Sequence, residues 1–359
     1  MPRVSLEIQD LSPTQKMEVE RRIARFELLW HSEQIPDLND FLPDDPAIRE
    51  LVHVELLAIE NEFRSRASQK SCDTVSLSKT SVPIRMTSSF DGPTQRFSGG
   101  LGDVWVVHEP SLGRTVVIKQ LQPRWRSHQR AREAFLQEVL ITSLLEHPGV
   151  APVHSVGETV DGRPCYSMRY IQGETFEEAI RKFHQRDQRL FPELRKLLNH
   201  FVTVCNTVAY AHSRGVLHRD LKPANVMIGA FGQTMVIDWG LAKHFSSVHS
   251  PKTSMSPEQA AGQVDKITIQ TDVFGLGAIL FMLLHGNPPY QGSSAEQSLD
   301  QAARGDVQFP SQQTSVPNAL AAICAKAMSQ LPAQRYSDAV ALASDVQNWL
   351  AGEPIMAMR

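Results

Sequence analysis

The sequence has few cysteines. Only four occur in 359 residues, and no two of them form a Cys-x-x-Cys pair: Cys72, Cys165, Cys205 and Cys324. This spacing argues against a disulfide framework and against a zinc site, and it is typical of free thiols in a reducing compartment. Two histidines, His244 and His249, have no cysteine or acidic companions at ligand spacing. We therefore interpret them as loop residues.

The sequence also lacks long apolar runs and a strong net charge. No run of about 18 apolar residues could span a bilayer, and the N-terminus has no basic segment followed by an apolar one. We therefore expect a cytoplasmic protein without a membrane segment. A formal net charge of −3 at pH 7 argues against a nucleic-acid binder that depends on phosphate contacts.

Composition and length are those of an ordinary globular protein. Hydrophobic residues make up 42% of the chain and charged residues 21%. The length allows one large two-lobed domain and a small additional one. Neither internal repeats nor coiled-coil heptads are present in the sequence.

Residues 216–228 place a carboxylate, a cation and an amide close together between apolar runs. Asp220 can accept a hydroxyl proton, Lys222 can neutralise a moving phosphoryl group, and Asn225 can hold Mg²⁺. Phosphoryl transfer depends on these groups, because positioning and charge stabilisation provide most of its catalysis. The alternative is a polar surface turn, but the complete run His-Arg-Asp-Leu-Lys-Pro-x-Asn weighs against it.

This run resembles the catalytic loop of the eukaryotic-like protein kinases, which in bacteria are called Hanks-type, and Lys222 matches the serine/threonine branch. The resemblance covers residues 96–356. It implies an α+β, bilobal protein-kinase-like fold with a small β-rich N-lobe and a larger helical C-lobe. It also implies ATP as the phosphoryl donor and Mg²⁺ as the metal.

We expect four segments along the chain. Residues 1–66 form a helical N-terminal module, 67–95 a flexible linker rich in Ser and Thr, 96–171 the N-lobe and 172–359 the C-lobe. Apolar spacings of three and four predict two long helices in the module, whose inner faces carry Val19, Ile23, Phe26 and Trp30, and Ile48, Val52, Leu56, Ile59 and Phe63. A docking or self-association role for these helices and simple support of the kinase both remain open.

A glycine-rich segment lies within residues 96–107, between apolar β-like runs, and a further β-like run follows at residues 115–119. Gly99, Gly100 and Gly102 let backbone amides approach phosphates, because no Cβ intervenes. In the resembling family, the lysine that ends the second strand, here Lys119, binds the α- and β-phosphates and pairs with a glutamate of the next helix. Glu138, in a helix predicted over 132–145, is the best-placed partner, and Glu133 is the alternative.

The resemblance also implies the remaining nucleotide contacts. Met168 is the expected gatekeeper, and Val117 stands where the family usually has Ala against the adenine ring. A second departure is Phe97, which replaces the first glycine of the loop. Glu174 either reaches the ribose or is an exposed acid at a helix start. The other residues expected around the nucleotide are Val104, Tyr170, Ile171 and Met227.

Asp238 ends a buried β-like run and is followed by Trp239 and Gly240. The resemblance makes Asp238 the main Mg²⁺ ligand, together with Asn225, and carboxylate and amide oxygens suit that hard cation. Trp239 replaces the usual Phe and keeps an aromatic side chain at this position.

The segment between Asp238 and Glu258 is short, with nineteen residues between them. The resemblance implies that Glu258 pairs with Arg335 and that Asp272 bonds the backbone of the catalytic loop. The usual Gly-Thr-Pro-x-Tyr run is absent, and this departure concerns peptide docking more than ATP binding. The hydroxyls that could be regulatory phosphosites near Arg219 are Ser246, Ser247, Ser250, Thr253 and Ser254.

We therefore predict a serine/threonine protein kinase that transfers the γ-phosphoryl group of ATP to Ser and Thr hydroxyls of proteins, autophosphorylates and acts in signalling. The alternative is a nucleotide-binding pseudokinase or scaffold with weak or no phosphotransfer. The altered glycine loop, Val117 and the short activation segment favour that alternative, whereas the complete reacting set opposes it. A small-molecule phosphotransferase fits poorly with the Ser-Pro-Glu run and Asp272.

Overall fold

The computed structural model describes residues 101–186, 191–239, 254–263, 266–309 and 316–358, and shorter stretches before them: 12, 15, 18–19, 21–23, 26, 38–45, 48–49, 52–53, 56, 84–85, 90 and 95–98. The chain divides into two compact units. The first consists chiefly of residues 1–80, and the second of residues 81–246 and 251–359. The predicted site residues Gly99 and Gly100 and the candidate phosphosites between 246 and 253 lie outside the described residues.

The first unit has helical residues on both sides of a short 3-10 helix, η2 (Leu38–Phe41). Its core consists of Val19, Phe26, Ile48, Val52 and Leu56, which have the predicted spacing, and of Phe41 of η2. The rings of Phe26 and Phe41 meet edge to face, with centroids 5.2 Å apart. The sequence pattern therefore predicted the inner face of this unit correctly, while Trp30, Ile59 and Phe63 lie outside the described residues.

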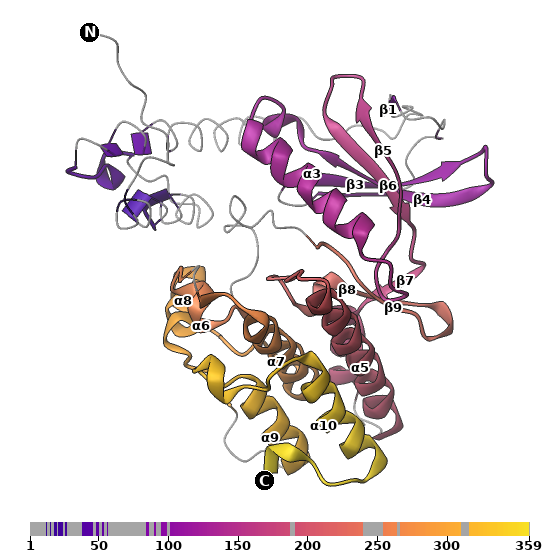
Figure 1. The fold of residues 1–359 in the computed structure, drawn as a ribbon, viewed down its shortest axis with the longest axis vertical. Helices are drawn as coiled ribbons and strands as arrows, with labels where there is room; N and C mark the ends of the chain where they lie inside the picture. The colour runs from indigo at the N-terminus through magenta and orange to yellow at the C-terminus, as the bar shows by residue number, and fades with distance from the viewer. Residues whose placement is uncertain are drawn as a thin grey trace. The chain divides into compact units, whose positions relative to one another are not determined.

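The second unit contains a six-stranded antiparallel sheet with the strand order β1-β5-β6-β4-β3-β2 (Figure 1). Its strands are β1 (Ile84–Arg85), β2 (Gln95–Ser98), β3 (Gly102–Glu109), β4 (Arg114–Leu121), β5 (Val153–Thr159) and β6 (Pro164–Arg169). Strand β1 pairs with β5, with Ile84 opposite Thr159. Three residues of the stretch predicted as a linker, Ile84, Arg85 and Gln95, therefore belong to the sheet.

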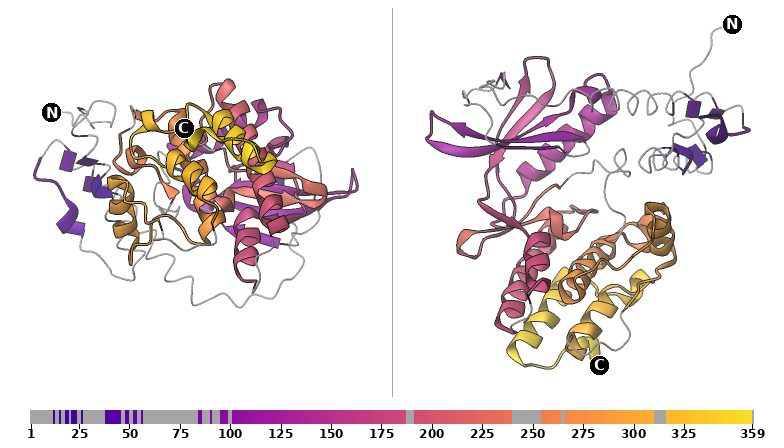
Figure 2. Two further views of the ribbon diagram at one scale, coloured as in Figure 1. Left: turned by 90° about the horizontal axis from the view of Figure 1, so that it is seen from below. Right: turned by 180° about the vertical axis from the view of Figure 1, so that it is seen from behind.

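One helix, α3 (Gln129–Leu144), packs against this sheet (Figures 1 and 2). It begins before the predicted start at Arg132, because the His128 side chain caps it by accepting a hydrogen bond from Ala131 N at 3.2 Å. A short helix, η3 (Pro123–Trp125), connects β4 to α3. Phe135 and Val139 of α3 pack against Leu121 and Tyr166 of the sheet.

The rest of the second unit is mainly helical, with a three-stranded sheet in the order β7-β8-β9. The strands are β7 (Gly173–Thr175), β8 (Val226–Gly229) and β9 (Thr234–Val236). The helices are α4 (Phe176–His184), α5 (Phe191–Ser213), η4 (Pro223–Asn225), η5 (Ala230–Gly232), α6 (Pro257–Ala260), α7 (Ile269–His285), α8 (Ala295–Arg304), α9 (Asn318–Ala327), η9 (Pro332–Gln334), α10 (Ala339–Ala351) and η10 (Met356–Met358). The sequence pattern predicted α5 and α7 to α10, but it did not predict α4.

Helix α7 forms the centre of the helical region and packs closely on two neighbours. A Cβ at Gly275 would lie 2.9 Å from Leu221 Cβ, and a Cβ at Gly277 would lie 2.6 Å from Met328 Cγ. Glycine at both positions therefore lets α7 approach residue 221, next to Asp220, and the end of α9 more closely than alanine would.

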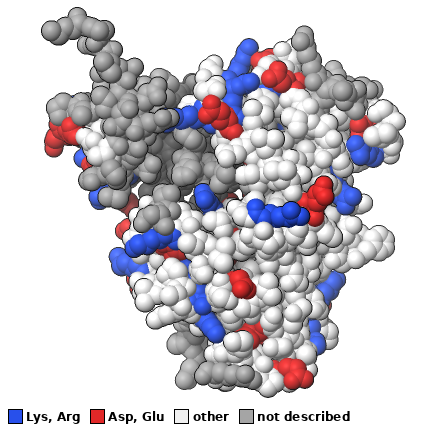
Figure 3. Space-filling view, viewed as in Figure 1, with Lys and Arg blue, Asp and Glu red and all other residues white. Residues whose placement is uncertain are grey.

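The surface charges and the cysteines are as expected from the low net charge and the spacing of the cysteines. On the face shown in Figure 3, Lys and Arg side chains are interspersed with Asp and Glu over the described residues. Cys165, Cys205 and Cys324 are free and buried, and Cys72 lies outside the described residues. None of the helices in the described ranges has the length and apolar character needed to cross a bilayer.

Candidate active site

A buried carboxylate anchors the backbone of residues 218–225. Asp272, in the first turn of α7, is 1% exposed and accepts hydrogen bonds from the amides of His218 and Arg219, both at 2.8 Å. The side chain of His212 also contacts Asp272, at 2.8 Å. Burial alone would raise the pKa of Asp272, but His212 and the surrounding hydrogen bonds hold it below its ordinary value. These bonds fix the loop at Arg219, whose φ of 64° is left-handed.

The carboxylate of Asp220 lies between an amide and a cation. Its Oδ2 accepts a hydrogen bond from Asn225 Nδ2 at 3.0 Å and lies 3.1 Å from Lys222 Nζ. Asn225 Nδ2 also donates to the backbone oxygen of Asp220 at 2.9 Å. The structure therefore brings together the three polar residues that the sequence placed in the catalytic loop.

Asp238 follows β9 and lies beside this loop. Ile237 N donates a hydrogen bond to Asn225 O at 2.9 Å. This bond holds the backbone before Asp238 against the backbone of Asn225. Asp238 has a left-handed φ of 66°. Trp239 is buried, its Nε1 donates to Val236 O at 3.0 Å, and its ring centroid lies 4.9 Å from that of His218. The tryptophan thus anchors the backbone directly after Asp238.

Lys119 links the six-stranded sheet to Asp238. Its Nζ lies 2.5 Å from Glu138 Oε1 and 2.9 Å from Asp238 Oδ1. Burial alone would lower the pKa of Lys119, but the two carboxylates raise it well above its ordinary value, so the amine stays protonated. Burial raises the pKa of Glu138, although Lys119 opposes that effect. Glu133, the alternative partner, instead accepts a hydrogen bond from Gln129 Nε2 at 2.7 Å.

The apolar residues predicted around the nucleotide lie on neighbouring strands. Val104 is opposite Lys119 in the β3–β4 pair, and Val117 is opposite Met168 in the β4–β6 pair. The remaining three predicted contacts lie just beyond these strands or on β8. Tyr170 and Ile171 follow β6 directly, and Ile171 packs in a small cluster against which Met227 of β8 also packs.

Gly102 and Glu174 have different surroundings. A Cβ at Gly102 would lie 3.1 Å from Cγ and 3.2 Å from Cε of Lys119, so glycine permits close approach of the loop to this lysine. Glu174, on β7, forms an ion pair with Lys182 of α4 at 2.7 Å. In this arrangement its carboxylate pairs within the helical region.

The residues present fit a nucleotide with bound Mg²⁺. Asn225 and Asp238 supply hard oxygen donors, and Lys119 places a protonated amine against Asp238. Within the described ranges, no cluster of three or more His, Cys, Asp or Glu side chains could hold a metal without further ligands. Mg²⁺ does not need such a cluster, because it binds one or two carboxylates together with phosphate oxygens and water.

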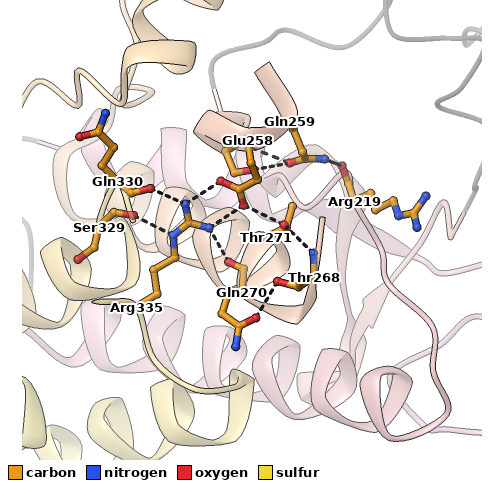
Figure 4. A network of polar contacts seen from close by, with 10 residues as sticks. Arg219, Glu258, Gln259, Thr268, Gln270, Thr271, Ser329, Gln330 and Arg335 are labelled. Carbon is orange, nitrogen blue, oxygen red and sulfur yellow. Dashed lines mark hydrogen bonds and ion pairs between the residues drawn. The ribbon is translucent and has the colours of Figure 1, made fainter. Parts of the chain in front are cut away.

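A second buried ion pair, between Glu258 and Arg335, lies near Arg219 of the catalytic loop (Figure 4). Arg335 donates to both oxygens of Glu258 at 2.8 Å, as the sequence predicted, and Thr271 Oγ1 donates to Glu258 Oε1 at 2.8 Å. Arg335 also donates to three backbone carbonyls, those of Gln270, Ser329 and Gln330. Gln259, the residue after Glu258, donates to Arg219 O at 2.8 Å, so the pair is connected to the catalytic loop.

The sequence analysis missed two side chains of this site, Tyr166 and His212. Tyr166 OH donates to Glu138 Oε1 at 2.9 Å, and His212 contacts Asp272. A weak signal for Tyr166 exists, because it lies two residues before Met168 in a predicted strand and therefore shares its face. The sequence offers no comparable signal for His212, whose partner lies 60 residues away.

Comparisons with known proteins agree with this geometry. Residues 98–348 match the family described as protein kinase domain. The serine/threonine-protein kinase PknD of Protochlamydia amoebophila (strain UWE25) is 32% identical over 290 residues, which cover 71% of this chain and 29% of that protein. PknD of Chlamydia trachomatis serovar D is 31% identical over 299 residues, with 71% and 31% covered. The chain thus spans less than a third of the length of these curated relatives.

The crystal structure of the Mycobacterium tuberculosis PknI kinase domain has a similar fold. It superposes with a TM-score of 0.58 at 23% sequence identity, and the match covers 77% of this chain and 100% of that domain. This likeness confirms the predicted α+β, bilobal architecture.

Proposed function

Because the chain belongs to the protein kinase domain family, we propose that it transfers the γ-phosphoryl group of ATP to Ser or Thr hydroxyls of proteins. One observation carries the proposal, namely the convergence of the reacting groups. Asp220 and Asn225 meet at 3.0 Å, and Lys119 and Asp238 meet at 2.9 Å. Because Ile237 N bonds Asn225 O, the two contacts lie side by side.

On the acceptor side, Asp220 receives and orients the substrate hydroxyl. Asn225 holds the Asp220 carboxylate by its amide, and Lys222 lies against the same oxygen, so both contacts fix the position of the carboxylate. A positioned general base of this kind contributes about 10²- to 10⁴-fold to the rate. Lys222 would also stabilise the negative charge that moves between donor and acceptor.

On the donor side, Lys119 provides the positive charge for the phosphates, and its raised pKa keeps that charge in place at neutral pH. Asn225 and Asp238 would hold Mg²⁺, which neutralises charge on the phosphate oxygens when it is bound. The close approach of Gly102 to Lys119 supports a phosphate-binding role for the loop. The other proposed nucleotide contacts are Gly99, Gly100, Val104, Val117, Met168, Tyr170, Ile171, Glu174 and Met227.

The test is the transfer of radiolabel from γ-labelled ATP, with Mg²⁺, to the protein itself and to casein. Asp220→Asn should lower the rate by at least about 100-fold while ATP binding remains. Asp306→Asn, at an exposed ion pair with Arg304, is the control and should be unchanged. Label that does not depend on Asp220, or ATP binding without any label in the wild type, would favour the pseudokinase alternative.

We also propose the domain division, location and partners predicted from the sequence. The separate core of the first unit supports a helical module at 1–66. The pairing of β1 with β5 departs from the predicted N-lobe of 96–171, because it joins Ile84 and Arg85 of the predicted linker to the sheet. The substrates would be cytoplasmic proteins with Ser or Thr acceptors, and the N-terminal helices would dock a partner or self-associate. Cross-linking of the full chain followed by mass spectrometry tests this role, since self-association requires links between two copies.

A further inference from the structure

Glu138 is the carboxylate that sets the position of Lys119, and it is almost completely buried. It is 1% exposed, and its Oε1 receives both Lys119 Nζ at 2.5 Å and Tyr166 OH at 2.9 Å. A buried carboxylate is stable only when it is paired and hydrogen-bonded. The tyrosine hydroxyl is therefore a second donor to the oxygen that binds the lysine.

Tyr166 is held at two places. It lies directly opposite Lys119 in the antiparallel pair β4–β6, so the sheet places both donors next to each other. Its ring packs against Phe135 of α3, with centroids 5.6 Å apart, and Phe135 is one helical turn before Glu138. One side chain thus fixes both the ring of Phe135 and the carboxylate of Glu138 on the same face of α3.

Lys119 has a competing partner. Asp238 Oδ1 lies 2.9 Å from the same amine, and the side chain of Asp238 is 44% exposed, whereas that of Glu138 is 1% exposed. Without the Tyr166 hydroxyl, Glu138 Oε1 would lose one of the two donors described above, and its contact with Lys119 would be weaker. The lysine would then favour Asp238, and α3 would be held to the sheet less firmly.

We propose that Tyr166 is a positioning residue whose hydroxyl holds the Glu138 carboxylate toward Lys119 and thereby fixes α3 on the sheet. The catalytic consequence rests on the proposed function, because it assumes that Lys119 binds the phosphates of ATP. The structural consequence for α3 does not depend on it.

Tyr166→Phe isolates the hydroxyl, because it keeps the ring that packs on Phe135. Tyr336→Phe is the matched control. Tyr336 is 3% exposed and donates to the buried carboxylate of Asp345 at 2.7 Å, near the C-terminus of the second unit. Both variants lose one buried bond between a tyrosine and a carboxylate, but only the first touches the pair that holds Lys119.

The first measurement is hydrogen–deuterium exchange of the full chain without nucleotide. Tyr166→Phe should raise the exchange rate of amides in residues 129–144 by about 10-fold, as expected when one hydrogen bond to a charged group is lost. Tyr336→Phe should leave those amides unchanged and affect residues 339–358. Unchanged exchange of residues 129–144 in Tyr166→Phe would overturn the proposal, whatever the activity of the protein.

The second measurement is steady-state kinetics with ATP as the varied substrate. Tyr166→Phe should lower kcat/KM for ATP by about 10-fold, whereas Tyr336→Phe should retain the wild-type value at temperatures where both variants are folded. In a Glu138→Ala background, Tyr166→Phe should have no further effect, because its partner is absent. A further loss in that background would show that Tyr166 acts elsewhere. An inactive wild type would refute the proposed function and leave the exchange experiment as the test of Tyr166.

Discussion

Glu138 and Glu258 are both buried glutamates paired with a cation, yet their surroundings shift their pKa values in opposite directions. Burial raises the pKa of both carboxyls, but the hydrogen bonds from Arg335 and Thr271 reverse this effect at Glu258, whose pKa is lowered. At Glu138 burial prevails and the pKa is raised. The difference follows from the donors, because Arg335 is bidentate whereas Lys119 is shared with Asp238.

This contrast separates two uses of the same chemistry. The Glu258–Arg335 pair is enclosed, and the arginine also binds three backbone carbonyls, so the pair connects segments of the helical region. In the Glu138–Lys119 pair, the lysine also contacts a second carboxylate, that of Asp238. We interpret the first pair as a fixed structural connection and the second as a functional contact that can change partners.

The largest effect on stability should come from the enclosed pair. Arg335→Met leaves Glu258 buried with fewer donors and leaves three carbonyls without their bonds from the arginine. Removal of one partner of a buried pair costs about 3–5 kcal/mol, so we expect a loss of this size in the free energy of unfolding. Urea denaturation followed by circular dichroism measures it.

The control is an exposed ion pair between an arginine and a carboxylate. In Arg304–Asp306, at 3.0 Å, the side chains are 64% and 58% exposed. Arg304→Met should therefore cost no more than about 1 kcal/mol. Equal losses in the two arginine variants would contradict the structural interpretation of the Glu258–Arg335 pair.

Loss of the Glu138–Lys119 pair should affect activity more than stability. Lys119→Met should lower phosphotransfer by at least about 100-fold, because it removes the positive charge at the phosphates. The loss of stability should be smaller than for Arg335→Met, about 1–3 kcal/mol, because Glu138 can take up a proton when its cation is removed. Phosphotransfer activity and urea denaturation, measured for both variants, test this expectation. A larger loss of stability in Lys119→Met than in Arg335→Met would contradict it.

The two pairs also show which contacts could be predicted from the sequence and which could not. Both were predicted, because each partner belongs to a recognisable motif: Lys119 after a glycine-rich segment, Glu258 after Ser-Pro. Helix α5 was predicted from apolar periodicity and α7 from a nearly continuous apolar run, and both signals are local. The auxiliary donor Tyr166 was not predicted, because its bond to Glu138 depends on the register of β4 and β6. Strand β1 was missed for a related reason, since two residues are too few to show alternation.

The opposite pKa shifts predict opposite dependences of stability on pH. Glu258 has a lowered pKa in the folded state, so its contribution is present above its ordinary value of 4.5 and is lost as the pH falls through the folded value. The stability advantage of the wild type over Glu258→Gln should therefore be constant at neutral pH and shrink below about pH 4.5. Urea midpoints of both proteins over this range measure the difference.

Glu138 should behave in the reverse way. Its folded-state pKa is raised above 4.5, so protonation favours the folded state and this contribution is lost as the pH rises through the folded value. The stability of the wild type relative to Glu138→Gln should therefore decrease as the pH rises above about 4.5 and through the folded-state pKa. If both glutamine variants gave differences with the same slope, the two glutamates would not be distinguished by their surroundings.

The smallest effect concerns the hydroxyl that assists Glu258. Thr271→Val removes the donor to Glu258 Oε1 and the acceptor of the Thr268 amide, at 2.8 and 3.1 Å. Because Arg335 still satisfies Glu258, we expect a loss of about 1–2 kcal/mol in stability and no change in kcat/KM for ATP. Thr203→Val, at an exposed position of α5, is the control for the change of side chain and should be nearly neutral. A loss of kcat/KM in Thr271→Val as large as that expected for Tyr166→Phe would show that the two hydroxyls serve the site alike.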